Sequence, residues 1–426
     1  MDKNTKALCG FLDGSHSAYH AAANTAAALD EAGYTRLSEG DRWVLAPGGK
    51  YYTCRGGSAL IAFRLPEGDP KGFLIAAAHT DRPSFKLKFR PELPGTYCRV
   101  STERYGGAIL STWLDRPLSV AGRVLVETEQ GAEARLVDID RDLLLIPSVA
   151  IHMNRQANDG YKWDLTRDLT PLFGGKDDTG KFGKLLEKAA GGKILSHDLY
   201  LYVRQKATVW GGEKQFISAQ GLDDLQCLYG CLQGFLHAGT GRSIPVLCAF
   251  DSEEVGSCST QGADSTFLED VLSRIAEGTV SGKNTLLQNS FLVSADNAHA
   301  VHPNHPELAD PENAPVMGQG VVLKFNSNLR YCTDGLGAGI FHRICKTAKV
   351  PVQSYYNRAD IPGGSTLGHI SIAHISVPTA DIGLPQLAMH SCYETAHLKD
   401  SAYLTAAMEA FFGSTLTITE NGFSVE

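Results

Sequence analysis

The spacing of hydrophobic and polar positions predicts a chain that mixes helices with buried strands. Residues 73–78, 245–250 and 291–295 are short apolar runs, a pattern typical of strands buried on both faces of a sheet. Apolar residues recur at helical spacing over 222–235, and an alanine-rich stretch over 17–31 favours another helix. These segments together predict an α/β architecture built around a largely parallel sheet.

The middle of the chain, residues 91–215, has a different and β-rich pattern. Segments 123–127 and 134–138 alternate in polarity on either side of a glycine, which predicts a hairpin. Residues 143–151 and 198–203 predict further strands. The α/β pattern returns after this segment, so the β-rich part is expected to interrupt the other.

Chain length supports this division, because 426 residues are too many for one ordinary hydrophobic core. We predict a catalytic α/β domain formed by residues 1–90 and 216–426. A second, β-rich domain over residues 91–215 is predicted to be inserted into it.

Composition excludes several classes of protein. The net charge of −8, without clustered Lys or Arg, argues against a general nucleic-acid binder. No apolar run approaches the roughly 20 residues that cross a bilayer, and no signal peptide is visible, so no membrane association is expected. The ten cysteines are scattered without a CxxC pair, which is typical of reduced thiols in a cytoplasmic enzyme.

The candidate chemistry lies where the predicted buried strands end. Each of the three apolar runs passes directly into carboxylate or imidazole side chains, namely His79 and Asp81, then Asp251, Glu253 and Glu254, then Asp296. Ligands of open α/β sheets bind at the carboxyl ends of strands, so these groups are expected to converge. Asp223 and Asp224 open a predicted helix in the same half of the chain, and His390 follows late in the sequence.

So many buried carboxylates, with so few Lys and Arg among them, need compensation. A pair of divalent ions is the simplest source, with a shared water as nucleophile and a spare carboxylate as general base. The adjacent residues Glu253 and Glu254 supply one carboxylate for a metal and another for that water.

The same segments resemble a known family, the M18 aspartyl aminopeptidases, over nearly the whole chain. The resemblance rests on the strings at 78–81, 147–155, 221–225, 253–257, 294–304 and 388–391. Members of that family are zinc exopeptidases assembled from dimers into tetrahedral dodecamers. The resemblance implies a zinc-exopeptidase-type α/β/α catalytic domain interrupted by a β-rich, barrel-like dimerisation domain.

The resemblance also implies metal ligands. It places His79 and Asp296 on one ion, Glu254 and His390 on the other, and Asp223 as the bridge between them. Two divalent ions per chain are expected, with Zn²⁺ favoured and Co²⁺ or Mn²⁺ as alternatives.

Further roles follow from the same likeness. Asp81 would fix the ring of His79, and Glu253 would be the general base acting on a metal-bridging water. His152, in the inserted domain, would reach the active site of a neighbouring subunit. The implied reaction is removal of N-terminal Asp or Glu from peptides.

A second set of residues is expected to contact the substrate. Lys324 matches the lysine of the family's pocket for the first side chain, and His299 is expected to line the same pocket. Gly364 and Ser365 belong to a segment that resembles the family's glycine-rich substrate-binding loop.

Several positions depart from the family pattern. Asp224 stands where Asn is usual, Leu222 lies in a segment where an Arg is common, Gly363 replaces a frequent Cys and Cys258 replaces an acidic residue. None of these removes a metal ligand. The missing Arg leaves open a broader or neutral preference for the first residue.

Two other functions also remain open at this point. The same two-metal core could serve a deacylase or a carboxypeptidase, or the chain could be an idle shell or cargo protein that keeps only the fold. The complete set of metal-ligand positions argues against the idle protein.

Overall fold

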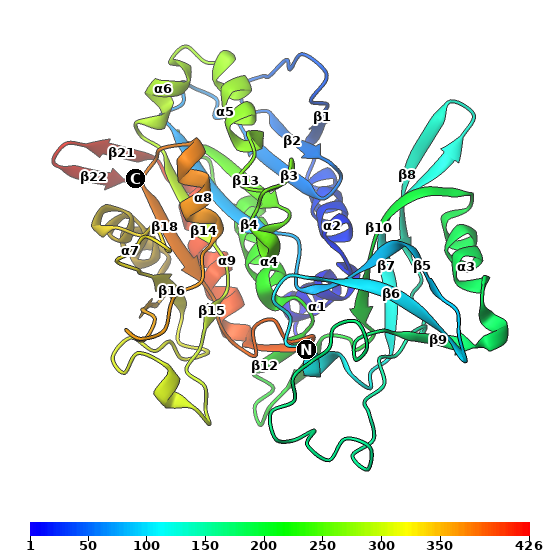
Figure 1. The fold of residues 1–426 in the computed structure, drawn as a ribbon. Coiled ribbons are helices and arrows are strands. Elements are labelled where there is room, and N and C mark those ends of the chain that lie inside the picture. The colour runs from blue at the N-terminus through cyan, green and yellow to red at the C-terminus, as the bar shows by residue number, and fades with distance from the viewer.

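A nine-stranded mixed sheet forms the centre of the molecule in the computed structural model, which describes residues 1–426 (Figure 1). In spatial order its strands are β1 (Thr35–Leu37), β2 (Lys50–Arg55), β3 (Ala59–Arg64), β13 (Ile244–Phe250), β4 (Phe73–His79), β14 (Phe291–Ala295), β18 (Thr379–Gly383), β16 (Val321–Lys324) and β17 (Val352–Tyr355). The three strands predicted from continuous apolar runs, β4, β13 and β14, are neighbours and run parallel. All three are buried along their whole length, as predicted.

Helices cover both faces of this sheet. Helices α2 (Ala18–Glu31), α4 (Leu222–His237), α7 (Gly335–Ala348) and α9 (Leu398–Gly413) contribute to the hydrophobic core on one face. Helices α5 (Phe267–Glu277), α6 (Gly282–Leu287) and α8 (Leu367–His374) contribute to the core on the other face. The predicted helices over 17–31 and 222–235 are confirmed.

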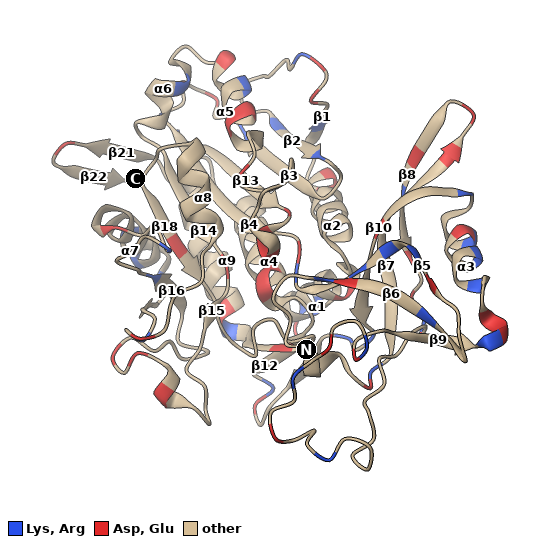
Figure 2. Cartoon of the chain, viewed as in Figure 1, with Lys and Arg blue, Asp and Glu red and all other residues tan.

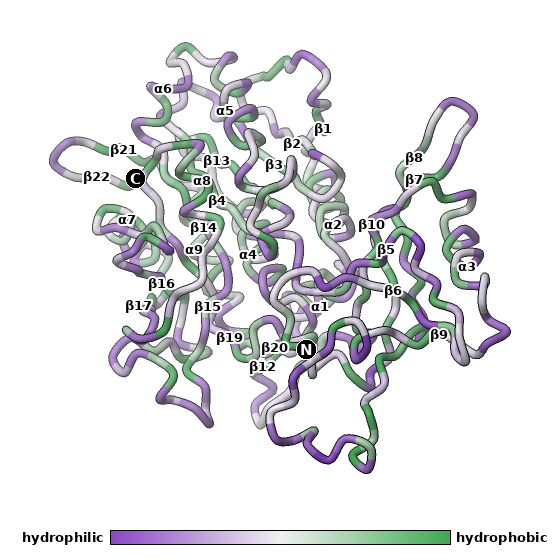
Figure 3. The backbone as a smooth tube through the Cα atoms, viewed as in Figure 1, coloured by the Kyte–Doolittle hydropathy of each residue, from purple (hydrophilic) through white to green (hydrophobic).

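The two cores lie on opposite faces of the sheet, and successive residues of a strand contribute to them in turn. In β4, Leu74 and Ala76 belong to the first core, whereas Phe73, Ile75 and Ala77 belong to the second. The apolar strands between the helices are visible in Figure 3, and charged residues lie mainly on helices and loops around them (Figure 2). Helices on both faces of a mainly parallel sheet define the predicted α/β class, which is confirmed.

The β-rich part forms a six-stranded antiparallel sheet beside the central one (Figure 1). In spatial order it consists of β8 (Gly131–Asp138), β7 (Leu118–Thr128), β10 (Ile194–Val203), β5 (Ser84–Leu93), β6 (Tyr97–Tyr105) and β9 (Leu172–Gly175). The predicted hairpin is β7–β8, and the strand predicted over 198–203 is part of β10. The domain boundaries proposed at residues 91 and 215 remain predictions.

One expectation within the β-rich part was wrong, and one helix there was not predicted. Residues 143–151 are not a strand, because Leu144, Leu145 and Ile146 make only isolated bridges and Pro147, which has no N–H to donate, follows them. The polar, glycine-rich stretch that separates the predicted strands contains a helix, α3 (Lys181–Ala190), which buries Phe182.

A five-stranded sheet joins segments that are distant in sequence. Its order is β11 (Thr208–Trp210), β12 (Phe216–Ala219), β20 (Glu394–His397), β19 (Pro385–Leu387) and β15 (Ala298–His299). The remaining elements are α1 (Lys3–Gly14), the hairpin β21 (Leu416–Thr419) to β22 (Gly422–Val425), and the 3-10 turns η1 (Leu110–Trp113), η2 (Lys176–Asp178), η3 (Glu253–Val255) and η4 (Pro306–Leu308). None of the helices has the length and apolar character needed to cross a bilayer. All ten cysteines are free thiols.

Candidate active site

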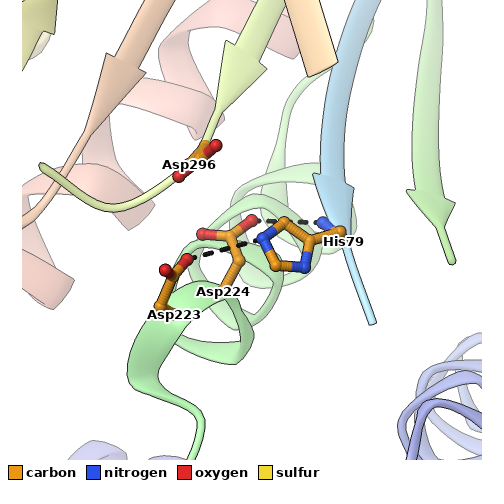
Figure 4. A group of neighbouring side chains, drawn as sticks. All are labelled: His79, Asp223, Asp224 and Asp296. Atoms are coloured by element: carbon orange, nitrogen blue, oxygen red, sulfur yellow. Dashed lines mark hydrogen bonds and ion pairs between the residues drawn. The ribbon is translucent and has the colours of Figure 1, made fainter. Parts of the chain in front are cut away.

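The predicted acidic and imidazole side chains meet at one end of the central sheet. His79 is the last residue of β4, Asp296 follows β14 directly, and Glu253 and Glu254 lie in η3 just after β13. Because these strands are parallel neighbours, their carboxyl ends lie at the same edge. Asp223 reaches this edge from the first turn of α4 (Figure 4).

His79 is the centre of the first half of the site. Its Nε2 lies 3.4 Å from Oδ1 of Asp223, and its backbone N–H donates to Oδ2 of Asp224 at 3.1 Å. Asp296 faces the same group from the end of β14 (Figure 4). The ring is 1% exposed, so its orientation is set by these protein groups and not by solvent.

His390 is the centre of the second half. Its Nε2 lies 3.3 Å from Oε2 of Glu254 and 3.5 Å from Oδ2 of Asp223. Its Nδ1 is 3.2 Å from the carbonyl oxygen of Gly107. Donation from Nδ1 to that carbonyl leaves Nε2 with a free lone pair. The two carboxylate oxygens of Asp223 therefore face two different imidazoles.

Burial among other negative groups shifts the pKa values of the carboxylates around these two imidazoles. Burial raises the pKa of Asp224 and Glu254 well above their ordinary values and that of Glu253 to about 8. Burial also opposes ionisation of Asp223, but the neighbouring imidazoles of His390 and His79 outweigh it and hold its pKa below the usual range.

Three buried carboxylate oxygens have no hydrogen-bond donor: Oδ1 of Asp223, Oδ1 of Asp224 and Oε1 of Glu254. Orphaned buried acceptors of this kind are rare in proteins unless an ion satisfies them. The ligand atoms form three overlapping groups in which all atoms lie within 4.8 Å of one another, namely His79 with Asp223, Asp224 and Asp296, His79 with Glu253 and Glu254, and Asp223 with Glu254 and His390. This set of oxygen and imidazole donors fits divalent zinc.

Asp81 holds several parts of the site together. Its Oδ1 lies 3.2 Å from Nδ1 of His79. The same carboxylate accepts the backbone N–H groups of Glu253 at 3.1 Å and Glu254 at 3.2 Å, and the hydroxyl of Tyr105 at 2.7 Å. Asp81 thus fixes the position of the glutamate pair as well as the ring of His79.

Glu394 is a buried residue of the site that the sequence reasoning missed. Its Oε1 accepts the backbone N–H of His390 at 2.7 Å, and its Oε2 accepts that of Asp223 at 3.0 Å. Its place in the sequence, four residues after His390, was the one available signal. Gly107 was missed as well, because nothing local relates it to His390.

The backbone is unusual on both sides of the site. Ser252 and His390 have φ values of 66° and 67°, a left-handed conformation that non-glycine residues seldom adopt. Strained backbone of this kind concentrates at functional sites, where the surrounding structure maintains it. At Gly106, φ is 72° and a Cβ atom would lie 3.1 Å from Cβ of Glu254, so glycine permits the close approach there.

A cavity opens next to these groups, and most of the predicted substrate residues line it. It contains Lys324, His299, Gly364 and Ser365 together with Asp223, Glu253, Glu254, Asp296 and His390. Tyr331, Tyr355 and Asn297 also line it and were not predicted. His152 lies elsewhere, in an exposed turn that does not line this cavity.

Lys324 is 3% exposed and already has partners in the protein. Its Nζ donates to the carbonyl oxygen of Asn297 at 2.9 Å and lies 3.5 Å from Oδ1 of Asp296. Its ammonium therefore compensates part of the negative charge of the site.

Comparison with known proteins decides the class of this site. A family model described as aminopeptidase I zinc metalloprotease (M18) matches residues 11–412. The chain belongs to the M18 family. It is a metalloaminopeptidase, and the resemblance read from its motifs is confirmed.

Relatives of this M18 chain are similar along their whole length. An M18 family aminopeptidase 2 of Clostridium acetobutylicum is 39% identical over 423 residues, covering 96% of this chain and 98% of the relative. One from Pseudomonas aeruginosa is 40% identical over 420 residues, covering 96% and 97%.

Two solved structures are similar to this chain over nearly its whole length. In the Ape4 and Nbr1 complex, determined by cryo-electron microscopy, the similar chain is 35% identical with a TM-score of 0.92, covering 95% of this chain and 84% of that one. The S. cerevisiae mApe1 dodecamer is 26% identical with a TM-score of 0.85, covering 96% of each chain.

Proposed function

We propose that this M18 aminopeptidase holds two divalent ions, zinc by preference, and removes N-terminal residues from peptides. His79 and Asp296 would hold one ion, Glu254 and His390 the other, with Asp223 between them. The observation that carries this proposal is the position of Asp223, whose Oδ1 lies 3.4 Å from Nε2 of His79 and whose Oδ2 lies 3.5 Å from Nε2 of His390. One carboxylate that faces two imidazoles is the arrangement a bridged pair requires.

The ions would polarise the scissile carbonyl and lower the pKa of the attacking water. Glu253 would accept the proton of that water and return it to the leaving amine. It lies beside the proposed ligands, and the Asp81 carboxylate holds its backbone N–H in place.

The preferred N-terminal residue would be Asp or Glu, with Lys324 pairing with its side-chain carboxylate. The position of Lys324 in the lining of the cavity supports this preference. A broader specificity is the second candidate, because the ammonium already lies 3.5 Å from Asp296 and donates to the Asn297 carbonyl. His299, Gly364 and Ser365 would contact the substrate under either specificity.

The chain would work as a homo-oligomer, a tetrahedral dodecamer built from dimers. Similarity to the S. cerevisiae mApe1 dodecamer supports this assembly. His152 would then approach the active site of a neighbouring subunit, since it lies in an exposed turn between Ile151 and Met153, which are 48% and 82% exposed. Ten free thiols are consistent with work in the cytoplasm.

The proposed reaction is tested with a panel of zinc-loaded assays. Peptides with each of the twenty N-terminal residues are offered with the amino group free and, in parallel, acetylated. The proposal predicts release of the first residue from free peptides, fastest for Asp and Glu, and none from acetylated ones. Equal cleavage of acetylated peptides would contradict an aminopeptidase, and equal rates for all first residues would favour the broader specificity.

A further inference from the structure

A second cavity of about 210 Å³ lies away from the metal-ligand groups. The end of α1, the segments that follow β8 and β10, and the end of β12 all contribute to its lining. The cavity therefore lies between the six-stranded sheet and the elements around the active site. No role of the M18 reaction requires it.

Arg82 lies in the lining of this cavity and has no partner. The residue is 7% exposed, yet its guanidinium makes no hydrogen bond and no ion pair within the protein, and Nη2 is completely buried. Burial lowers the pKa of Arg82 to about 10, against the attraction of Glu394. A buried guanidinium without a hydrogen-bonded partner is expensive to maintain.

Gln220, in the lining of the same cavity, carries a second donor without a partner. The side chain is 8% exposed, and its Oε1 accepts the backbone N–H of Val203 at 2.9 Å. That bond fixes the orientation of the amide, and its Nε2 is buried without an acceptor. Lys206, at the exposed rim, adds an ammonium with no partner of its own.

Each acidic group around the cavity already accepts a bond from a donor of the protein. Asp138 pairs with His16 at 2.7 Å and accepts the hydroxyl of Tyr202 at 2.7 Å. Asp140 pairs with Arg204, and Asp13 accepts the backbone N–H of residue 207 at 2.7 Å. Among the buried side-chain atoms of the lining, the two without a partner are both donors, Nη2 of Arg82 and Nε2 of Gln220, so the unmet demand is for an acceptor.

We propose that this cavity binds a small inorganic anion, of halide to phosphate size, between the guanidinium of Arg82 and the amide of Gln220. Such an anion accepts charge-assisted hydrogen bonds from donors that nothing else satisfies. A cation would face an unpaired guanidinium, and an apolar ligand would leave the buried donors unmet.

Gly221 keeps the guanidinium in position. A Cβ atom there would lie 2.7 Å from Cδ and 2.8 Å from Nη1 of Arg82, so only glycine leaves room for this side chain. Arg82 also follows Asp81 directly, and Gln220 lies shortly before the first turn of α4, which carries Asp223. A bound anion would therefore stabilise the contact between the six-stranded sheet and the segments that carry Asp81 and Asp223.

The proposal is tested with the full zinc-loaded protein in a halide-free and phosphate-free buffer. Ionic strength is held constant with a bulky organic sulfonate while bromide, or in a separate arm phosphate, replaces it. A saturable rise of the melting temperature of about 1–3 °C is expected in one arm or both, and the responding arm identifies the ion. No response in either arm would overturn the proposal.

Variants separate this site from general salt effects. Arg82→Met should abolish the saturable response, whereas Arg343→Met, at an exposed position on α7, should keep it. Gln220→Glu retains the acceptor for Val203 and pairs Arg82 within the protein. It should melt higher than the parent without added anion and lose the response. Retention of the response by Gln220→Glu would contradict the proposal even if Arg82→Met does not fold.

Crystals grown with bromide locate the ion directly. An anomalous difference peak within hydrogen-bonding distance of the Arg82 guanidinium is the expected result if bromide is the arm that responds. Bromide at surface positions alone, together with a thermal response, would show that the stabilisation arises elsewhere and would overturn the assignment.

Discussion

Oδ1 of Asp81 lies 3.2 Å from Nδ1 of His79, and both side chains are buried. This contact directs Nε2 of the ring toward Asp223. Asp81→Asn keeps the shape and removes the charge, so zinc affinity should fall by about 10- to 100-fold. Competition with a chromogenic chelator measures the affinity, with Asp177→Asn on an exposed turn as the control. Unchanged affinity in Asp81→Asn would rule out a positioning role.

Glu253→Gln should leave both metals bound and remove most of the turnover. Glu253 is not among the proposed ligands, but it supplies the carboxylate that takes the proton of the water. Loss of a general base lowers kcat by about 100- to 10,000-fold. Steady-state kinetics measure the loss of turnover, and elemental analysis of the same preparation measures the retained metal. Near-normal turnover would mean that another group is the base.

Glu394 should matter although it touches no substrate. It accepts two buried backbone N–H groups, at His390 and Asp223. Glu394→Ala leaves both donors unsatisfied, at a cost of about 1–3 kcal/mol each in the free energy of unfolding. Glu394→Gln keeps one acceptor and should recover part of the stability and of the zinc affinity. Denaturant unfolding and chelator competition follow the two effects, and equal behaviour of both variants would contradict this reading.

Lys324→Met should weaken turnover of peptides that begin with Asp or Glu more than of neutral ones. The ammonium is the cation proposed to meet the substrate carboxylate, and Met keeps its apolar stem. Because Nζ also lies 3.5 Å from Asp296, metal content has to be measured alongside kcat/KM. Equal losses on acidic and neutral peptides, with metal retained, would favour the broader specificity.

The metal-free protein should lose stability as pH rises from about 4.5 to about 8. Burial raises the pKa of Glu253 from its ordinary 4.5 to about 8, so the folded state binds more protons than the unfolded state over this interval. The pKa of Glu394 is raised to about 8 by burial in the same way. The free energy of unfolding therefore falls with pH. Bound zinc should reverse the trend, since ligands must be deprotonated. Thermal melts across pH, with chelator and with zinc, measure this difference.

Much of the site could be predicted because its residues follow features that are visible locally. His79, Glu253, Glu254 and Asp296 each come directly after an apolar strand, and parallel strands bring their ends to one edge. Glu394 could not be predicted in this way. Its role depends on a five-stranded sheet made of distant segments, which leaves no local periodicity to read.

The β-rich part shows the same limit. The β7–β8 hairpin was predictable from alternation around a glycine, since the pairing is local. Residues 143–151 have an apolar pattern like that of a strand, yet they pair at isolated positions only, and Pro147 has no N–H to continue the pairing. Gly107 reaches His390 through tertiary packing alone.

The number of metal ions that full activity requires tests the central claim most directly. Metal-free protein is titrated with zinc while release of the N-terminal residue from a free peptide is followed at each ratio. The bridging position of Asp223 between His79 and His390 predicts that activity reaches its plateau at two ions per chain. Full activity at one ion per chain, or no turnover with two ions bound, would contradict the two-metal site.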